Sequence, residues 1–190
     1  MGLFDSLLGR SRPVPSKIEG LFAMATAQVT LETQLGLKAG ETAGICFRAV
    51  ESNYFDKASS ELDGLLQISA KETGTNYQTK TDEYGYRWVL VSDPQFENLV
   101  ATIHIVSQTL KENGFGDQLL AAVFRFTTSS GKPIYWIYNY KRGKFYPFVP
   151  EGNTRKRDNA IELRLSSAMD HELPMEKELE RWYALWGIPF

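Results

Sequence analysis

The chain has 190 residues, which is enough to bury one sizeable hydrophobic core. Its hydrophobic content of 43% and charged content of 23% are ordinary for a globular protein, and no apolar run reaches the roughly 20 residues that a transmembrane helix needs. The formal net charge of −2 argues against nucleic acid as a partner.

Residues 1–16 are expected to form a segment separate from the rest of the chain. Leu3, Phe4, Leu7 and Leu8 recur at helical spacing and make a short apolar stripe, and the two prolines of RSRPVPS then indicate a linker. Four apolar side chains bind a membrane only marginally. We therefore expect the stripe to dock on the protein's own body or on a partner, with peripheral membrane contact as the alternative.

The region from residue 17 to residue 50 is predicted to hold a short helix over 17–24 and two strands. The strands are QVTLETQLGL (28–37) and TAGICFRAV (42–50), joined by a turn at 38–41. Cys46 lies among apolar neighbours in the second strand, which favours a buried small hydrophobic side chain over a nucleophile. A single cysteine and the absence of a signal-peptide pattern suit a reducing cytoplasm.

Two longer helices with a strand between them are predicted next. Ser52 is a suitable N-cap for the first helix, whose apolar face contains Phe55, Ala58, Leu62, Leu65 and Leu66. A turn at 82–85 precedes the apolar strand YRWVLV. The second helix spans about residues 95–113, and its apolar face contains Phe96, Leu99, Val100, Ile103, Val106 and Leu110.

The remaining chain is predicted to add strands at 118–128, 133–140 and 144–150. The segment 159–169 is ambiguous between strand and helix, and the alternation of Ile161, Leu163 and Leu165 favours a strand. A final helix over 175–186 would place Trp182 and Trp186 one turn apart and hold them against the core, or expose them as a partner-binding hot spot. The pattern predicts a single α+β domain over 17–190, with helices packed on a mainly antiparallel sheet.

The usual catalytic patterns are absent from this sequence. Two histidines, His104 and His171, and one cysteine cannot assemble a zinc site of ordinary spacing, and there is no phosphate-binding loop or nucleophile elbow. For His104 we expect a position at the core edge, donating to a backbone carbonyl, and for His171 a solvated loop position. We therefore expect no enzymatic activity, no cofactor and no metal.

A cluster of basic residues is the sequence's clearest candidate for a binding surface. It comprises six side chains in two predicted loops, Lys141, Arg142, Lys144, Arg155, Lys156 and Arg157. Gly143 supplies positive φ for the first loop, the turn KRGK. One interpretation is a solvated hairpin tip that discourages edge-to-edge association of sheets. The other is a surface for an acidic protein or a phosphate-bearing partner, and the sequence leaves both open.

A small-ligand or enzymatic function is the alternative hypothesis. In that case Tyr138, Tyr140, Tyr146 and Arg142 would converge on a pocket for an anionic ligand beneath the aromatic strands. A packed interior at these residues would count against it.

Six strings in order carry a resemblance over nearly the whole chain. They are MGLFDSLLGR with RPVPS, DEYGYRWVLV, ENGFGDQLLAAVFRF, YNYKRGKFYPFVPEG, RDNAIELRL and ERWYALWGIPF. With them the chain resembles the PspA-associated protein family of bacteria and archaea labelled PspAB. The resemblance implies a cytoplasmic accessory or adaptor role beside phage-shock protein A, a membrane-associated scaffold of the envelope-stress response. It implies no catalytic residue, cofactor or oligomeric state. By analogy alone, the expected fold is similar to that of secretion chaperones.

Overall fold

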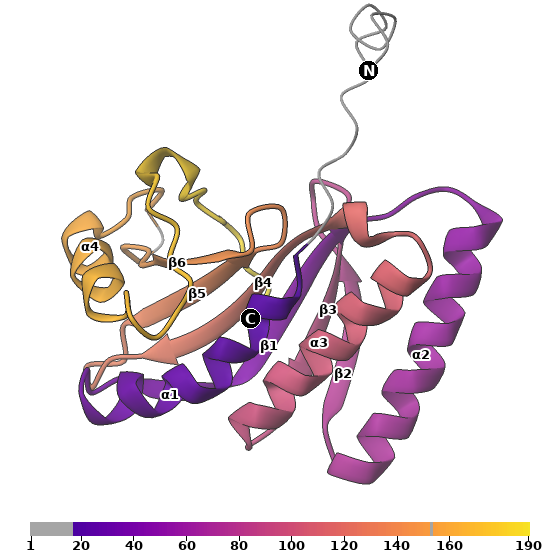
Figure 1. The fold of residues 1–190 in the computed structure, drawn as a ribbon, viewed down its shortest axis with the longest axis horizontal. Coiled ribbons are helices and arrows are strands. Elements are labelled where there is room, and N and C mark those ends of the chain that lie inside the picture. Colours follow the sequence, from indigo (N-terminus) through magenta and orange to yellow (C-terminus); the bar gives the residue numbers. More distant parts are fainter. Residues whose placement is uncertain (1–16, 153) are drawn as a thin grey trace, which may run out of the picture.

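A computed structural model describes residues 17–152 and 154–190 of the protein. Within these residues, six strands form one antiparallel sheet in the order β2-β3-β1-β4-β5-β6, and the fold is α+β (Figure 1). The strands are β1 (Lys38–Arg48), β2 (Asn76–Thr81), β3 (Tyr86–Ser92), β4 (Leu119–Thr127), β5 (Pro133–Asn139) and β6 (Lys144–Phe148). The helices are α1 (Ala23–Thr33), α2 (Asn53–Thr73), α3 (Phe96–Glu112) and α4 (Asn159–Ala168), with 3-10 turns η1 (Glu19–Phe22), η2 (Gly116–Gln118) and η3 (Leu179–Arg181).

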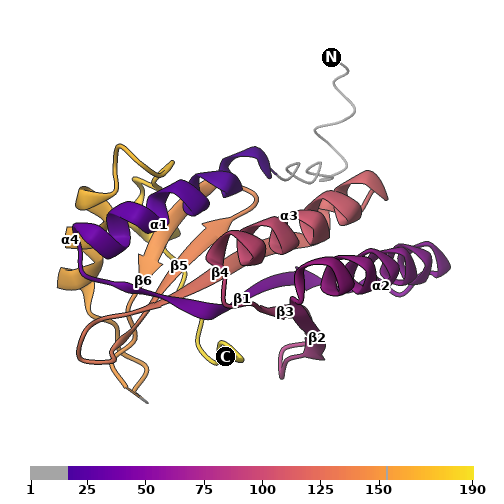
Figure 2. The ribbon, with the colours of Figure 1, turned by 90° about the horizontal axis from the view of Figure 1, so that it is seen from below.

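The two faces of the sheet are covered in different ways. Helices α1, α2 and α3 lie on one side, which we call the helical face, and the C-terminus lies on the other (Figure 2). Because strand side chains alternate between faces, Ile45 of β1 points into the helical layer and Cys46 points to the opposite side. The central strands are therefore buried on both faces.

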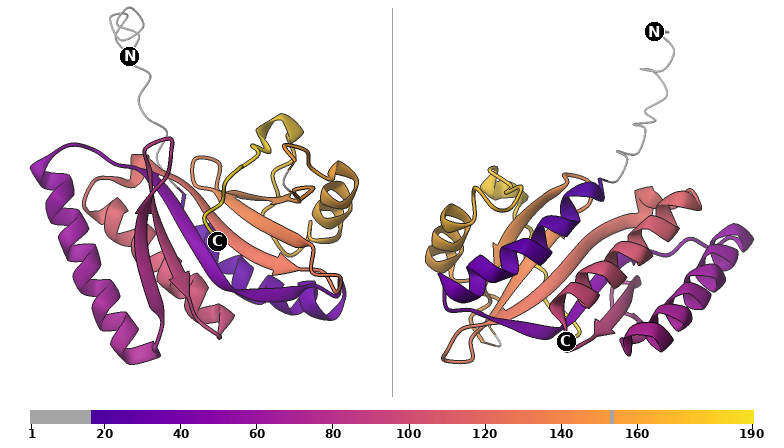
Figure 3. Two further views of the ribbon diagram at one scale, coloured as in Figure 1. Left: turned by 180° about the vertical axis from the view of Figure 1, so that it is seen from behind. Right: turned by 60° about the horizontal axis from the view of Figure 1, so that its bottom comes forward.

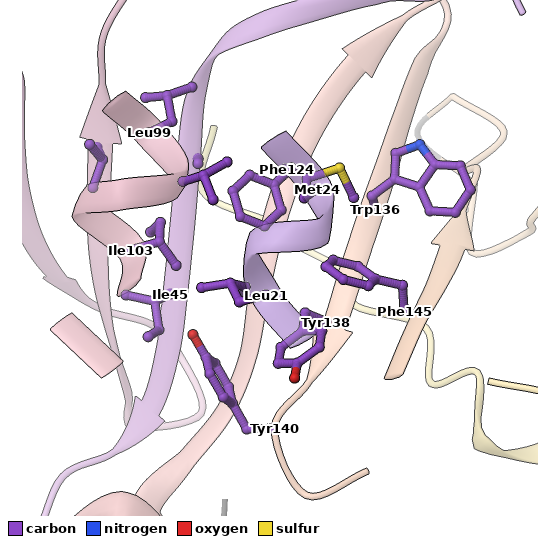
Figure 4. Close-up of a cluster of buried hydrophobic side chains, with 14 of the residues drawn as sticks. Leu21, Met24, Ile45, Leu99, Ile103, Phe124, Trp136, Tyr138, Tyr140 and Phe145 are labelled. Atoms are coloured by element: carbon purple, nitrogen blue, oxygen red, sulfur yellow. The ribbon is translucent and has the colours of Figure 1, made fainter. Parts of the chain in front are cut away.

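The main core lies between the sheet and the helices. Leu21, Met24, Phe124, Trp136 and Tyr138 meet there at 0% exposure (Figure 4). All six predicted apolar-face residues of α3 are buried in this core. In α2 the Ser52 hydroxyl accepts a hydrogen bond from the Phe55 N–H (3.1 Å), which confirms the expected N-cap.

The opposite face is covered by the last nine residues, 182–190, which we call the C-terminal strap. The strap crosses the sheet without a helix, and the face it covers is the strap face (Figure 3). Trp182 stacks on Tyr146, with ring centroids 6.3 Å apart, and Trp186 packs edge-on against Phe148 at 5.1 Å. On this face, separate aromatic contacts between the strap and the sheet take the place of the continuous layer of helices that covers the other face.

The N-terminal strand prediction was wrong. Residues 28–33 belong to α1, and the predicted turn at 38–41 is the start of β1, which is one long strand. The helix forms because Leu21, Met24, Ala27 and Leu31 repeat every three or four residues and are all fully buried. Val29, an apolar residue of the predicted strand, is 62% exposed.

Two predictions in the C-terminal third were also wrong. Residues 159–168 form α4, because the Asp158 carboxylate caps the Ile161 N–H at 3.0 Å and Leu163 faces outward. The final helix is limited to the single turn η3. Just before it, the Phe145 N–H of β6 donates to the Pro174 carbonyl, and the Glu176 N–H donates to the Phe145 carbonyl. These bonds hold residues 174–176 in an extended conformation.

No helix in the described part of the chain is long and apolar enough to cross a membrane. The stripe Leu3, Phe4, Leu7 and Leu8 lies outside the described residues, so its docking stays a prediction.

Candidate binding pockets beside the C-terminal strap

One hollow of the strap face lies between the strap and the turn that joins β2 to β3. It has a volume of about 700 Å³, and we call it the strap pocket. Five aromatic residues line it, with aliphatic side chains and two carboxylates: Cys46, Asp82, Glu83, Tyr84, Tyr86, Trp88, Leu120, Ala121, Tyr183, Ala184, Leu185, Trp186, Gly187 and Pro189. No lysine, arginine or histidine is among these lining residues.

Asp82 holds the aromatic wall of the strap pocket in place. One carboxylate oxygen accepts hydrogen bonds from the backbone N–H groups of Tyr84 (3.0 Å) and Tyr86 (2.9 Å). The other accepts from Trp88 Nε1 at 2.9 Å. Gly85 adopts φ 80°, which the turn requires. One side chain thus fixes both the turn and the indole.

The strap is held to the sheet by hydrogen bonds to its carbonyl groups. Tyr146 Oη donates to the Tyr183 carbonyl at 3.0 Å, and Arg157 Nη1 donates to the Trp182 carbonyl at 2.7 Å. At the end of the chain, Tyr135 Oη donates to the Phe190 carbonyl at 3.3 Å. The strap is therefore anchored at both ends, while its middle borders the pocket.

Gly44 provides the space for the last residue. A Cβ atom at Gly44 would lie 2.6 Å from Cε1 of Phe190, and 3.2 Å from atoms of both Leu90 and Trp88. The glycine therefore allows the Phe190 ring to approach the backbone of β1.

Cys46 lies on the floor of the strap pocket and is 4% exposed. Burial, with a smaller contribution from Asp82, raises the pKa of its thiol to about 12. The thiol stays protonated at neutral pH and has little nucleophilic character. The structure thus places Cys46 where the sequence predicted it, as a buried hydrophobic side chain.

A second hollow lies at the end of the β5–β6 hairpin. It has a volume of about 470 Å³ and is lined by Lys17, Asn139, Lys141, Arg142, Arg181 and Tyr183; we call it the hairpin pocket. Two of its residues come from the predicted basic loop, and Lys17 and Arg181 come from opposite ends of the described chain.

Three of the six predicted basic side chains are ion-pair partners within the described residues: Lys141 pairs with Asp117 at 3.9 Å, and Arg142 and Arg157 form shorter pairs. Arg142 donates to Glu176 through Nε (2.7 Å) and Nη2 (3.2 Å). Arg157 donates through Nε to both carboxylate oxygens of Glu162, at 2.9 and 2.8 Å, and Glu162 also accepts from the Val149 N–H. Burial raises the pKa of Glu162, and Arg157 offsets part of that rise.

Lys141 differs in exposure from the three remaining basic residues. Lys141 is half-buried, and its Nζ donates to the Asp117 carbonyl at 2.6 Å. Lys144, Arg155 and Lys156 are exposed. Gly143 adopts φ 68° in the turn, as expected.

The two basic loops lie at opposite ends of β6. One precedes Lys144 and the other follows Phe148, so five strand residues separate them, roughly 17 Å along the strand. They do not form one contiguous patch. Arg155 instead lines a third hollow of about 550 Å³ on the strap face, which shares Tyr84 and Trp186 with the strap pocket.

The residues of the alternative anionic-ligand hypothesis are not brought together. Tyr138 and Tyr140 are fully buried in the core of the helical face, whereas Tyr146 is on the strap face beneath Trp182. Burial raises the pKa of Tyr138 to about 12, so its hydroxyl remains protonated and donates to the Lys17 carbonyl at 3.0 Å. Of the four residues, Arg142 lines the hairpin pocket.

The two histidines differ in exposure. His104 is half-buried at the edge of the core, with its ring centroid 4.3 Å from that of Phe22. Its Nδ1 has no hydrogen-bond partner in the described part of the chain, and burial lowers its pKa. His171 is exposed. No group of three or more His, Cys, Asp or Glu residues suited to a metal occurs within the described residues.

Sequence reasoning missed most of the residues that line the two pockets. Tyr84, Tyr86 and Trp88 stand in DEYGYRW, where Tyr86 and Trp88 at alternate positions of one strand predict a common face and Tyr84 lies in the turn before them. Lys17 and Arg181 gave no such signal, because only the tertiary structure brings them to the hairpin.

No curated protein and no solved structure matches this chain. The family model described as PspA associated protein B matches residues 1–190, the whole length. The chain therefore belongs to the PspA associated protein B family, and the family's name links it to PspA.

Proposed function

We propose that the protein is a non-enzymatic accessory protein that binds PspA directly through the strap pocket. The family name supplies the link to PspA, and the pocket supplies a surface of the right kind.

The observation that carries the proposal is the aromatic lining of the strap pocket. Tyr and Trp are the residues that most often supply binding energy in protein interfaces, especially around a pocket that accepts an anchor side chain. Tyr84 and Tyr183 are 60% and 51% exposed, and Trp186 is half-buried against Phe148. A partner's apolar side chain inserted here would be removed from water on several sides.

The charge of the pocket specifies the partner's chemistry. Asp82 and Glu83 stand at the turn, and no cation lines the pocket. A partner segment that presents an apolar side chain next to a lysine or arginine is complementary to this arrangement. We therefore propose that PspA contributes an apolar side chain flanked by a basic residue.

The basic loops and the N-terminal segment are proposed as additional contacts. Lys144, Arg155 and Lys156 are exposed, and Arg155 lies closest to the strap pocket because it lines the neighbouring hollow. The stripe at residues 3–8 would contact a partner or the inner face of the membrane, in a cytoplasmic protein.

The direct test is a binding titration of purified PspA with the wild-type protein and with Tyr84→Ser. Loss of this exposed aromatic side chain is expected to weaken binding by roughly tenfold or more. The matched control is Tyr54→Ser on α2, since Tyr54 is 78% exposed and lies away from the pocket. Equal affinity of the two variants for PspA would rule out the strap pocket as the binding site.

A small apolar ligand is the second candidate, because about 700 Å³ is within the size range of small-molecule sites. Native mass spectrometry of the purified protein separates the two functions. A stoichiometric bound small molecule that Tyr84→Ser removes would favour a ligand carrier, and a ligand-free chain that binds PspA would favour the accessory role.

A further inference from the structure

The hairpin pocket collects positively charged side chains from three separate parts of the chain. Lys17 comes from the start of the described residues, Lys141 and Arg142 from the β5–β6 turn, and Arg181 from η3. Its two other lining residues are Asn139 and Tyr183, and no carboxylate is among them. Every charged group that lines this hollow is therefore a cation.

Two hydrogen bonds of the Lys17 backbone hold this residue in place. Its N–H donates to the Tyr140 carbonyl at 2.8 Å, and its carbonyl accepts from Tyr138 Oη at 3.0 Å. Its side chain lies across Gly143, where a Cβ atom would come within 2.9 Å of the lysine Cβ and Cδ. The glycine, which also needs positive φ, therefore leaves room for the lysine stem.

Arg142 and Arg181 are oriented by carboxylates that do not line the hollow. Arg142 binds Glu176, whose side chain is 4% exposed, through two nitrogens, and it contacts Glu178 at 2.6 Å through Nη2. Arg181 Nε contacts Glu178 at 3.4 Å. A guanidinium group has five N–H donors in a fixed plane, so donors remain on both arginines after these contacts.

Asn139 adds a neutral donor. Its side-chain oxygen accepts the backbone N–H groups of Lys141 (3.0 Å) and Arg142 (3.3 Å), which closes the hairpin turn. The oxygen is thereby used by the turn, and the amide NH₂ group is left as the hydrogen-bonding group that Asn139 can offer to a ligand.

We propose that the hairpin pocket binds a phosphate group. Arginine and lysine donors that converge from several directions match the oxygens of a phosphate, and planar guanidinium groups bind such oxygens with two hydrogen bonds. Three carboxylates, Glu176, Glu178 and Asp117, offset three of the four positive charges, so the remaining charge of one positive unit balances a singly charged phosphodiester such as a lipid head group.

The position of Lys17 points to a phosphate at a membrane surface. The chain leads from this pocket into residues 1–16, which carry the apolar stripe. A lipid phosphate in the pocket and apolar side chains of the same segment would combine two weak membrane contacts, and stable peripheral binding usually needs two. A soluble phosphate-bearing ligand shares the same chemistry, and the experiment distinguishes the two sources.

The test uses the full chain and two probes. The first probe is inorganic phosphate, titrated while the backbone amide NMR signals of residues 139–143 are followed. The second is co-sedimentation with phosphatidylcholine vesicles, with and without phosphatidylglycerol.

The variant is Lys17→Gln with Arg181→Gln, which leaves the Arg142–Glu176 pair intact. The matched control is Lys144→Gln with Lys156→Gln, two exposed cations that do not line the hairpin pocket.

The expected result is saturable phosphate binding at residues 139–143, and vesicle binding that requires phosphatidylglycerol. The Lys17/Arg181 variant should lose roughly 30-fold in affinity, since each cation near an anionic surface contributes about a fivefold factor, and the control should change little. Phosphate binding without vesicle binding would assign the site to a soluble phosphate ligand. Equal losses in variant and control, or no saturable phosphate shift, would overturn the proposal.

Discussion

The two faces of the sheet differ in how they are buried. The helical face is covered by three helices whose side chains interlock in one continuous core. The strap face is covered by nine residues without a helix, and its cluster is completed by half-buried side chains such as Trp186 and Phe190. The comparison indicates that the helical face provides stability and that the strap face, which contains the strap pocket, is suited to binding.

The difference follows from geometry. A helix presents several side chains to a sheet and satisfies its own backbone groups, so adjacent helices leave little free volume. An extended segment is only one chain wide and leaves hollows beside it. Its carbonyl groups need partners, which Tyr146, Arg157 and Tyr135 supply. A strap can therefore open locally at a lower free-energy cost than a helix in the core.

The largest expected effect compares two phenylalanines. Phe124→Ala on the helical face should lower the free energy of unfolding by about 3–5 kcal/mol, because the side chain is fully buried. Phe190→Ala at the end of the strap should cost only about 1 kcal/mol, since that ring is half-buried. Urea denaturation measures both, and equal losses would contradict the difference between the faces.

Arg157→Leu is expected to be almost as destabilising. Glu162 is 1% exposed, and without Arg157 its carboxylate would either stay charged without a cation or take up a proton, at a cost of about 3 kcal/mol. The same change removes the hydrogen bond to the Trp182 carbonyl, so amide exchange should rise in the strap. Arg155→Leu is the control, because Arg155 is exposed, and its effect should stay within about 0.5 kcal/mol. A small effect of Arg157→Leu would show that the pair is dispensable.

Two glycine substitutions should have opposite signs. Gly44→Ala places a Cβ 2.6 Å from the Phe190 ring and 3.2 Å from the buried Leu90 and Trp88 side chains, and should cost about 1–3 kcal/mol. Gly64→Ala in α2 meets no atom within 4 Å and should stabilise the protein by about 0.5–1 kcal/mol. Thermal unfolding of the two variants gives the comparison. A neutral Gly44→Ala would mean that Phe190 does not depend on this close approach.

The smallest expected effect is the pH dependence of the Arg142–Glu176 pair. The hydrogen bonds from Arg142 lower the pKa of Glu176 in the folded protein below its usual 4.5. A carboxyl group with a lowered folded pKa contributes stability above its unfolded pKa and loses it as the pH falls through the folded value. The contribution should thus be complete at neutral pH and decline below pH 4.5. Glu176→Gln should remove that part of the loss of stability in acid. Urea denaturation at several pH values measures it, and a pH dependence of the unfolding free energy that is the same in wild type and variant would contradict the pairing.

The sequence predicted much of the fold because the apolar residues of most elements repeat at one clear spacing, either that of a helix or that of a strand. The apolar face of α3, the N-cap Ser52 and the strands from 119 to 148 followed from local signals. The prediction failed where the apolar residues fit both the two-residue repeat of a strand and the helical repeat. Residues 28–33 and 159–168 alternate like strands, but their burial follows the helical repeat through Leu31 and Leu165.

The candidate sites were less predictable for a different reason. A run of basic residues shows charge but not its partners, so the internal pairs of Arg142 and Arg157 could not be recognised from sequence. The carboxylates that pair with them stand 34 and 5 residues away, and only the folded chain selects them. In the same way, Trp182 and Trp186 are spaced as on a helix but contact the sheet from an extended strap.

The central claim is that the strap face binds PspA, and hydrogen–deuterium exchange of the protein with and without PspA tests it most directly. We expect PspA to slow amide exchange at residues 82–86 and 183–189, which border the strap pocket, and to leave α1 and α3 unchanged. Protection confined to the helical face, or no protection anywhere at saturating PspA, would contradict the claim.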